Sequence, residues 1–270
     1  MPSSVTNVAI PNFMKHSRRL DAQGRNYAEY SLAGSRASVL FKTGQQPTVD
    51  AVHMSEQTFT PAAGRLAPTR FYDPVVALTR ERLWRSLAAM YVAPRPGDVI
   101  ADVGCGTGSL AVLLGRVEPR VQIIGLDPDR EVLALARGKA EAAGVTVDWR
   151  VSMGDALVDA VGASSVDTVV SSLVLHQCPL RMKRAILAAI HDVLKPGGKV
   201  VIADFGLQRT TLMRTAFRIV ALADGKEDTQ PNADGVVPKL LSEYGFKDVR
   251  EAEVVPTVSG SISVYVAGKA

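Results

Sequence analysis

The chain has 270 residues, of which 47% are hydrophobic, and this allows one domain with an extension or two small domains around a sizeable core. The formal net charge of +4 is mildly basic, and Lys and Arg form no run longer than short pairs. A dedicated nucleic-acid-binding protein usually concentrates its positive charge more strongly. Two cysteines and four histidines without ligand spacing exclude a disulfide framework and argue against a metal site.

The amino-terminal part of the chain is the least informative. Its first residues show no long apolar core, and no apolar run in the chain reaches membrane-spanning length, so we expect a cytoplasmic protein. Residues 1–70 are interpreted as an N-terminal extension that covers the mouth of the main domain, residues 71–270, with a disordered tail as the alternative. Within the extension, the apolar spacing between Arg18 and Leu32 suggests a helix.

A helix begins the main domain. Asp73 followed by Pro74 suits a helix start, with Asp as the N-cap and Pro at the first helical position. Apolar residues recur near helical spacing from there to Met90. Pro94, Pro96 and Gly97 then predict the end of the helix.

A strand, a glycine-rich turn and a helix follow in immediate succession. The apolar run from Val99 to Val103 predicts a strand, and a helical pattern runs from Leu110 to about Val117. Three glycines occupy alternate positions between them: Gly104, Gly106 and Gly108. The dinucleotide-binding fingerprint requires a glycine at the fifth position after the first, where this chain has Ser109. The turn presents backbone to a ligand, but not in the pattern of a nicotinamide site.

An aspartate ends the second predicted strand, Val121 to Leu126. A carboxylate offers two acceptor oxygens, so Asp127 at this position suits the two hydroxyls of a ribose, with a helix cap as the alternative. Pro128 opens a helix that ends near Gly144.

Two further predicted strands are followed by polar residues, which we expect at the same edge of the sheet as Asp127. The segment from Val145 to Val151 alternates with period two and predicts a strand, and Asp155 lies just past its end. Val166 begins a fourth strand that leads to the polar pair Ser171 and Ser172, with His176 following at its exit. Parallel strands bring such exits to one edge of a sheet.

The remaining sequence predicts alternating helices and strands. The expected helices are Arg181–Leu194, Thr211–Leu222 and Val236–Tyr244, the last with Gly245 as its C-cap, and the expected strands are Lys199–Asp204, Phe246–Val255 and Ser261–Ala267. The last two strands are expected to form a hairpin, so they need not be parallel to the others. Residues 224–235 are polar and are interpreted as a loop.

The glycine turn, Asp127, Asp155, the exit from Ser172 to His176, and Leu194-Lys-Pro-Gly-Gly198 stand in one order. In this order the chain resembles the class I S-adenosylmethionine (SAM) dependent methyltransferases over about residues 70 to 268. It looks most like the ubiquinone/menaquinone C-methyltransferase type and its small-molecule relatives. The resemblance implies a Rossmann-like, doubly wound α/β fold with a seven-stranded sheet, mostly parallel, that ends in an antiparallel hairpin.

The resemblance also implies how SAM is bound. The methionine part would contact the turn, and Asp127 would hold the ribose. Asp155 and Ala156 would contact the adenine, and Ser172 would lie beside the methyl-bearing sulfur. The remaining implied cofactor contacts are Tyr72, Asp102, Gly104, Cys105, Gly106, Thr107, Gly108 and Pro128. His176-Gln177 differs from the polar pair usual in the quinone enzymes, which puts a quinone substrate in doubt.

Methyl transfer from a sulfonium is an in-line displacement that needs alignment and a dry site, not a covalent nucleophile. An acceptor that loses a proton needs a base, and the ordinary pKa of histidine makes His176 the best candidate. Tyr72 and Asp204 are the other polar side chains expected to face the methyl group.

The sequence thus favours a methyltransferase that moves a methyl group from SAM to a small molecule, such as a phenol, a quinol or another secondary metabolite. Two alternatives stay open: a nicotinamide-dependent oxidoreductase and a non-catalytic SAM-binding protein. Among methyltransferases, an RNA acceptor is the second choice, and the absence of a basic cluster disfavours it. A homo-oligomer is compatible with the sequence.

Overall fold

A computed structural model describes the backbone of residues 14–20, 26–32 and 38–42, and residues 80–270 in full. The chain divides into two compact units, Met1–Phe59 and Thr60–Ala270. The predicted start of the main domain at residue 71, the helix start at Asp73 and the site residue Tyr72 lie outside the described residues.

The first unit contains a three-stranded antiparallel sheet, in the order β1-β2-β3. Its strands are β1 (Met14–Leu20), β2 (Asn26–Leu32) and β3 (Ser38–Lys42). The predicted helix from Arg18 to Leu32 was therefore wrong. Gly24 separates two segments, and the second contains Tyr27 and Tyr30, aromatic residues that favour strands.

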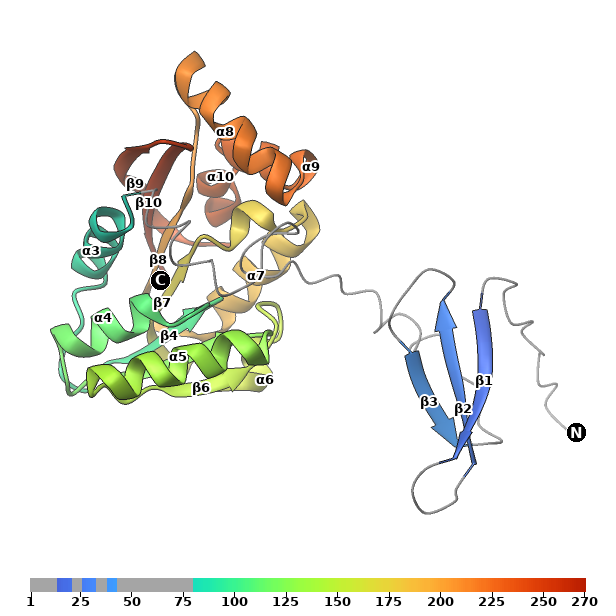
Figure 1. Ribbon diagram of the computed structural model, residues 1–270. Helices are drawn as coiled ribbons and strands as arrows, with labels where there is room; N and C mark the ends of the chain where they lie inside the picture. The colour runs from blue at the N-terminus through green and yellow to red at the C-terminus, as the bar shows by residue number, and fades with distance from the viewer. Residues whose placement is uncertain (1–13, 21–25, 33–37, 43–79) are drawn as a thin grey trace, which may run out of the picture. The chain divides into compact units, whose positions relative to one another are not determined.

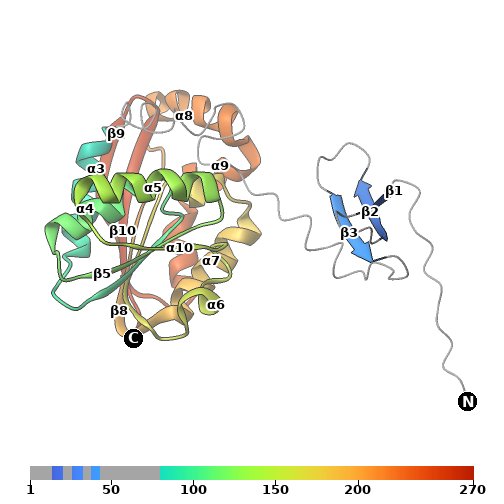
Figure 2. The same ribbon diagram turned by 60° about the horizontal axis from the view of Figure 1, so that its bottom comes forward.

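The second unit is built on a seven-stranded sheet, in the order β6-β5-β4-β7-β8-β10-β9 (Figures 1 and 2). Five strands are parallel: β4 (Val99–Val103), β5 (Gln122–Asp127), β6 (Asp148–Val151), β7 (Val166–Ser172) and β8 (Leu194–Phe205). β9 (Lys247–Thr257) and β10 (Gly260–Gly268) form the terminal hairpin, and β10 runs antiparallel to both of its neighbours. The predicted fold class is confirmed.

Helices cover both faces of this sheet (Figure 1). One buried core lies beneath α3 (Glu81–Val92) and α4 (Ser109–Val117), with α5 (Arg130–Ala143) beside α4. The other lies beneath α6 (Leu157–Val161), α7 (Leu180–Val193) and α10 (Val236–Glu243). The strands between these layers are rich in Val and Ile because both of their faces are buried.

The register of the sheet aligns the carboxyl ends of the parallel strands β4, β5, β7 and β8. Val103 of β4 pairs with Leu126 of β5 on one side and with Ser171 of β7 on the other. One residue further along, Ser172 pairs with Ala203 of β8. The chain order reverses on either side of β4, and a doubly wound sheet binds its ligands at such a reversal.

The second unit departs from expectation in a few elements. Residues 224–235, predicted as a loop, contain helix α9 (Lys226–Ala233), which follows α8 (Thr211–Asp224). Its polar sequence was misleading because Thr229 and Asn232 are buried and their side chains donate to the carbonyls of Gly225 and Phe205. The C-cap of α10 is Tyr244, not Gly245, and β6 begins only at Asp148.

Candidate active site

The glycine turn joins the end of β4 to the start of α4. Gly104, Gly106 and Gly108 all have positive φ angles, of 69°, 53° and 74°. The amides of Gly104 and Cys105 donate to the carbonyl of Leu126 at 2.8 and 3.0 Å, which ties the turn to β5. A Cβ on Gly104 would lie 2.3 Å from Val174, so the turn has this shape because glycine permits both the backbone angle and the contact.

Asp127, the last residue of β5, connects the second strand to the same turn. Its Oδ2 accepts a hydrogen bond from the Gly106 amide at 3.0 Å, and its Oδ1 accepts one from the Asp129 amide at 2.9 Å. Burial raises the pKa of Asp127, and these two backbone donors oppose the rise. A carboxylate has about four acceptor sites, so these two bonds leave acceptor capacity for hydroxyl groups of a ligand.

Asp102 is a buried carboxylate beneath the turn. It is fully buried, and neither of its oxygens has a hydrogen-bond partner in the part of the chain that the structure describes. Burial raises its pKa to about 7, although the positive charge of Arg85 acts in the opposite direction. A buried acceptor without a donor is costly, and a cationic or donor-bearing ligand group would relieve this cost.

The other expected cofactor residues surround this turn or follow neighbouring strands. Cys105 is buried, and burial raises the pKa of its thiol, so it is a neutral packing residue. Thr107 is also buried and accepts a hydrogen bond from Lys139 at 2.9 Å. Asp155 and Ala156 are half-buried in the turn that follows β6. Pro128 and Ser172 are half-buried directly after β5 and at the end of β7.

The structure thus brings three of the predicted groups to one edge: the glycine turn, Asp127 and the end of β7 at Ser172. Asp155 follows β6, which pairs with β5 along this edge. The structure does not describe Tyr72, so its roles stay predictions.

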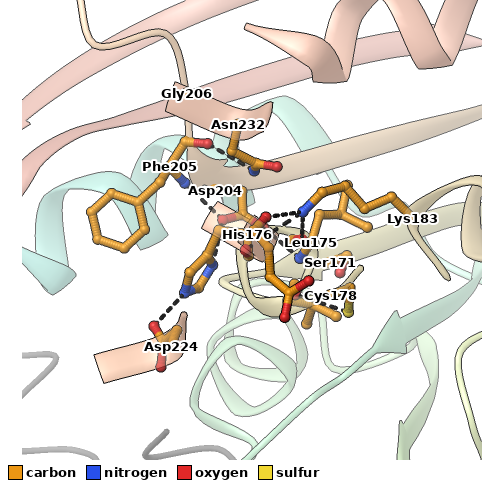
Figure 3. A network of polar contacts seen from close by, with 12 residues as sticks. Ser171, Leu175, His176, Cys178, Lys183, Asp204, Phe205, Gly206, Asp224 and Asn232 are labelled. Carbon is orange, nitrogen blue, oxygen red and sulfur yellow. Dashed lines mark hydrogen bonds and ion pairs between the residues drawn. The ribbon is translucent and has the colours of Figure 1, made fainter. Parts of the chain in front are cut away.

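His176 lies in a short 3-10 helix, η3 (Leu175–Gln177), between two buried aspartates (Figure 3). Its Nδ1 is 2.7 Å from Oδ1 of Asp204, at the end of β8, and its Nε2 is 3.3 Å from Oδ2 of Asp224, at the end of α8. Burial alone would lower the pKa of His176, but the two aspartates outweigh it and raise the pKa to about 9.

This environment argues against the predicted role of His176 as a base. With a pKa of about 9 the ring is an imidazolium at neutral pH, and both of its N–H groups point at carboxylates. An imidazolium has no lone pair with which to accept a proton. Asp204 likewise does not stand free to face a methyl group, because Oδ2 accepts from the amide of Leu175 at 2.7 Å and Oδ1 from that of Phe205.

Lys183, in α7, is a second buried cation next to this site (Figure 3). Its Nζ donates to the carbonyl oxygen of Leu175 and, at 2.9 Å, to that of Asp228 in α9. Burial lowers its pKa, and the charge of Asp204 opposes this. Together, His176 and Lys183 fasten η3 to α8 and α9.

Sequence reasoning missed Asp224 and Lys183 as parts of this network. Asp224 is the first residue of the segment that was interpreted as a polar loop, so no role was assigned to it. One signal was present: it is the sole acidic residue in the helical run from Thr211. Lys183 carries no comparable signal, because lysines are usual on amphipathic helices.

Two kinds of feature, a metal-binding cluster and a membrane-spanning helix, are absent from the described part of the chain. Residues 80–270 and the three short strands show no group of three or more His, Cys, Asp or Glu residues that could hold a metal ion. In the same part, none of the helices has the length and apolar character needed to cross a membrane.

Comparison with known proteins identifies the fold around this site. Residues 100–198 match the family described as "Methyltransferase domain". The chain is 32% identical over 136 residues to 2-phytyl-1,4-naphthoquinone methyltransferase of Synechococcus elongatus, covering 49% of this chain and 57% of that protein. It is 34% identical over 124 residues to the ubiquinone/menaquinone biosynthesis C-methyltransferase UbiE of Rubrivivax gelatinosus, covering 46% of each.

A solved structure agrees with these matches. Magnesium protoporphyrin IX methyltransferase from Synechocystis PCC 6803, solved with bound S-adenosylhomocysteine, superposes with a TM-score of 0.56 at 22% identity over 70% of this chain and 83% of that one. At this identity the likeness concerns the fold. The chain spans about half the length of the two curated relatives named above. Over residues 100–198 the chain matches a methyltransferase domain, and the glycine turn, Asp127 and the sheet order lie in or around this matched segment.

Proposed function

We propose that this protein transfers a methyl group from SAM to a small-molecule acceptor by in-line displacement. The observation that carries the proposal is the link between Asp127 and the Gly106 amide, set beside the buried Asp102, whose oxygens have no hydrogen-bond partner among the described residues. These groups lie at the reversal point of the sheet, where a doubly wound fold binds its ligand.

The residues present fit SAM. The buried Asp102 carboxylate suits the amino group of the methionine part, and the backbone of Gly104 to Gly108 would surround the rest of that part. Asp127 would accept hydrogen bonds from the ribose hydroxyls with its remaining acceptor sites. Asp155 and Ala156 would contact the adenine, and Ser172 would lie beside the sulfur. Cys105, Thr107 and Pro128 would complete the walls of the site.

SAM supplies a methyl group on a sulfonium, so the residues around it need only hold the two reactants in line and exclude water. In this proposal His176 is a positioning residue, because its ring joins β8 to α8 through Asp204 and Asp224. A proton lost by the acceptor would leave through another group, and Tyr72 stays the proposed neighbour of the methyl group.

A phenol or quinol is the acceptor class that we propose. The relatives named above are methyltransferases of a phytyl-naphthoquinone and of ubiquinone or menaquinone biosynthesis, which supports an aromatic acceptor of this kind. We further propose that the protein acts in the cytoplasm.

Calorimetric titration with SAM and with S-adenosylhomocysteine tests the proposal, with NADH as the control ligand. We expect micromolar binding of both adenosyl ligands and no binding of NADH. Binding of NADH alone would establish the oxidoreductase alternative. Binding of SAM without methylation of any phenol or quinol in an acceptor screen would favour the non-catalytic alternative.

A further inference from the structure

The most exposed apolar side chains of residues 80–270 lie on two neighbouring elements. Within residues 80–270, the four most exposed large apolar side chains are Leu222 (81%), Leu212 (79%), Val258 (67%) and Ile219 (66%). Three of them lie in α8 and the fourth in the turn between β9 and β10. Single exposed apolar residues are ordinary on a protein surface, but a group of them marks a binding surface.

The three α8 residues share one side of the helix. Their spacings of seven and three residues place Leu212, Ile219 and Leu222 along one stripe. The opposite side of α8 faces the protein, where Phe217 and Asp224 are buried. The stripe therefore points away from the domain core, and packing among residues 80–270 does not explain it.

The turn with Val258 lies beside α8. A Cβ on Gly260 would lie 3.4 Å from Cβ of Phe217, so the end of the β9–β10 hairpin touches α8. Figure 2 shows the hairpin ending next to this helix. We call Leu212, Ile219 and Leu222 the α8 patch; Val258 lies in the neighbouring turn, which reaches α8 on the side of Phe217.

The exposed charged residues of α8 are arginines, while Lys226 and Glu227, of opposite charge, are exposed at the start of α9. Arg214 and Arg218 are exposed on α8, and the helix has no acidic residue before the buried Asp224. A helix with an exposed apolar stripe whose own exposed charges are arginines is typical of a helix that lies in the interface of an anionic membrane.

The α8 patch also lies at the edge of the sheet that holds the candidate site. α8 follows the carboxyl end of β8, and the β9–β10 turn reaches the same level, because Ile262 pairs with Phe205. We propose that α8 and the β9–β10 turn dock on an anionic phospholipid surface, with the α8 patch inserted among the headgroups. Resting on the proposed methyl transfer, this docking would admit an acceptor dissolved in the bilayer.

Sedimentation of the full chain with vesicles tests the docking. The probes are vesicles of phosphatidylcholine alone and of phosphatidylcholine mixed with phosphatidylglycerol. We expect binding to the mixed vesicles and weaker binding as salt is raised, because the arginines contribute through screened charge. The triple variant Leu212→Ser/Ile219→Ser/Leu222→Ser should lower the partition constant by at least about tenfold.

A double variant, Val117→Ser/Leu135→Ser, is the matched control, because these residues are exposed apolar positions of α4 and α5. It should bind the mixed vesicles as the native chain does. Equal binding by the triple variant and the native chain would overturn the proposal. Absence of vesicle binding by the native chain would also overturn it. A native dimer that the triple variant dissociates, without vesicle binding, would instead assign the patch to a second copy of the chain.

The same samples separate this proposal from the proposed function. A SAM titration of the triple variant should match that of the native chain, because none of the three residues is among those proposed to hold SAM. Vesicle binding without SAM binding would overturn methyl transfer and leave the docking in place. SAM binding without vesicle binding would overturn the docking and leave the proposed methyl transfer in place.

Discussion

The charge of His176 gives a measurable dependence of stability on pH. His176→Gln replaces a buried imidazolium between Asp204 and Asp224 with a neutral amide. The rise in its pKa from 6.5 to about 9 amounts to about 2.5 pKa units. At about 1.4 kcal/mol for each unit, the folded state gains about 3 kcal/mol from holding this proton.

The sign of the effect follows from the raised pKa. Below about pH 6.5 the ring is protonated in both the folded and the unfolded chain, and its contribution is fully present. Between pH 6.5 and about 9 the unfolded chain has lost the proton and the folded chain keeps it, so stability falls as pH rises. Above about pH 9 the contribution is lost.

Urea unfolding followed by far-ultraviolet circular dichroism, repeated from about pH 6 to pH 10, measures this effect. The free energy of unfolding of the native chain should exceed that of His176→Gln at low pH, and the difference should shrink by about 3 kcal/mol at high pH. His191→Gln is the control, since His191 is half-buried at the edge of Phe246 and burial lowers its pKa. A difference between native chain and His176→Gln that stays constant with pH would refute the charged pairing.

Three further substitutions test other parts of the site. Asp127→Ala should weaken SAM binding by about 1–3 kcal/mol in calorimetry, because ribose hydroxyls lose their acceptor, and unchanged affinity would defeat the ribose assignment. Gly104→Ala should lower the free energy of unfolding by about 1–3 kcal/mol, since its φ is 69° and the new Cβ would meet Val174; full stability in urea would contradict this. Lys183→Met should cost about 1–3 kcal/mol of stability by leaving the carbonyl of Asp228 without its donor, and a denaturation midpoint equal to that of the native chain would rule this out.

The sequence predicted the central sheet well because its signals are local. The run from Val99 to Val103 is apolar except for Asp102, as suits a strand buried on both faces, and β4 has these same bounds. The alternate glycines predicted a turn, and all three have positive φ angles. Asp127 was predicted at the end of the second strand and ends β5. Each of these features depends on a few neighbouring residues.

The errors arose where distant contacts decide the structure. α9 looked like a loop because it is polar, yet its buried Asn232 donates to the carbonyl of Phe205, 27 residues away in the sequence. The choice of His176 as the best candidate base could not take account of Asp204 and Asp224, because nothing in its neighbourhood along the chain reveals them. Tertiary partners of this kind set the pKa of a buried group, and one sequence does not show them.

Different interactions stabilise the two sides of the candidate site. This difference suggests which side determines the choice of acceptor. On the β4–β5 side, backbone amides, glycines and two aspartates, Asp102 and Asp127, form the site, and these need little from the rest of the chain. On the β7–β8 side, buried charges of His176 and Lys183 hold η3, α8 and α9 together.

The match to the family model covers the first side and only part of the second. The matched segment stops at residue 198, before the end of β8 and before both α8 and α9 begin. A family keeps the part that binds its common cofactor and changes the part that meets each acceptor. Since α8 is fixed to the site through the His176–Asp224 pair, a change of residues in α8 would reach the acceptor side without disturbing Asp127 or the glycine turn. We therefore expect the choice of acceptor to depend on residues 206–233, and the choice of cofactor on residues 102–127.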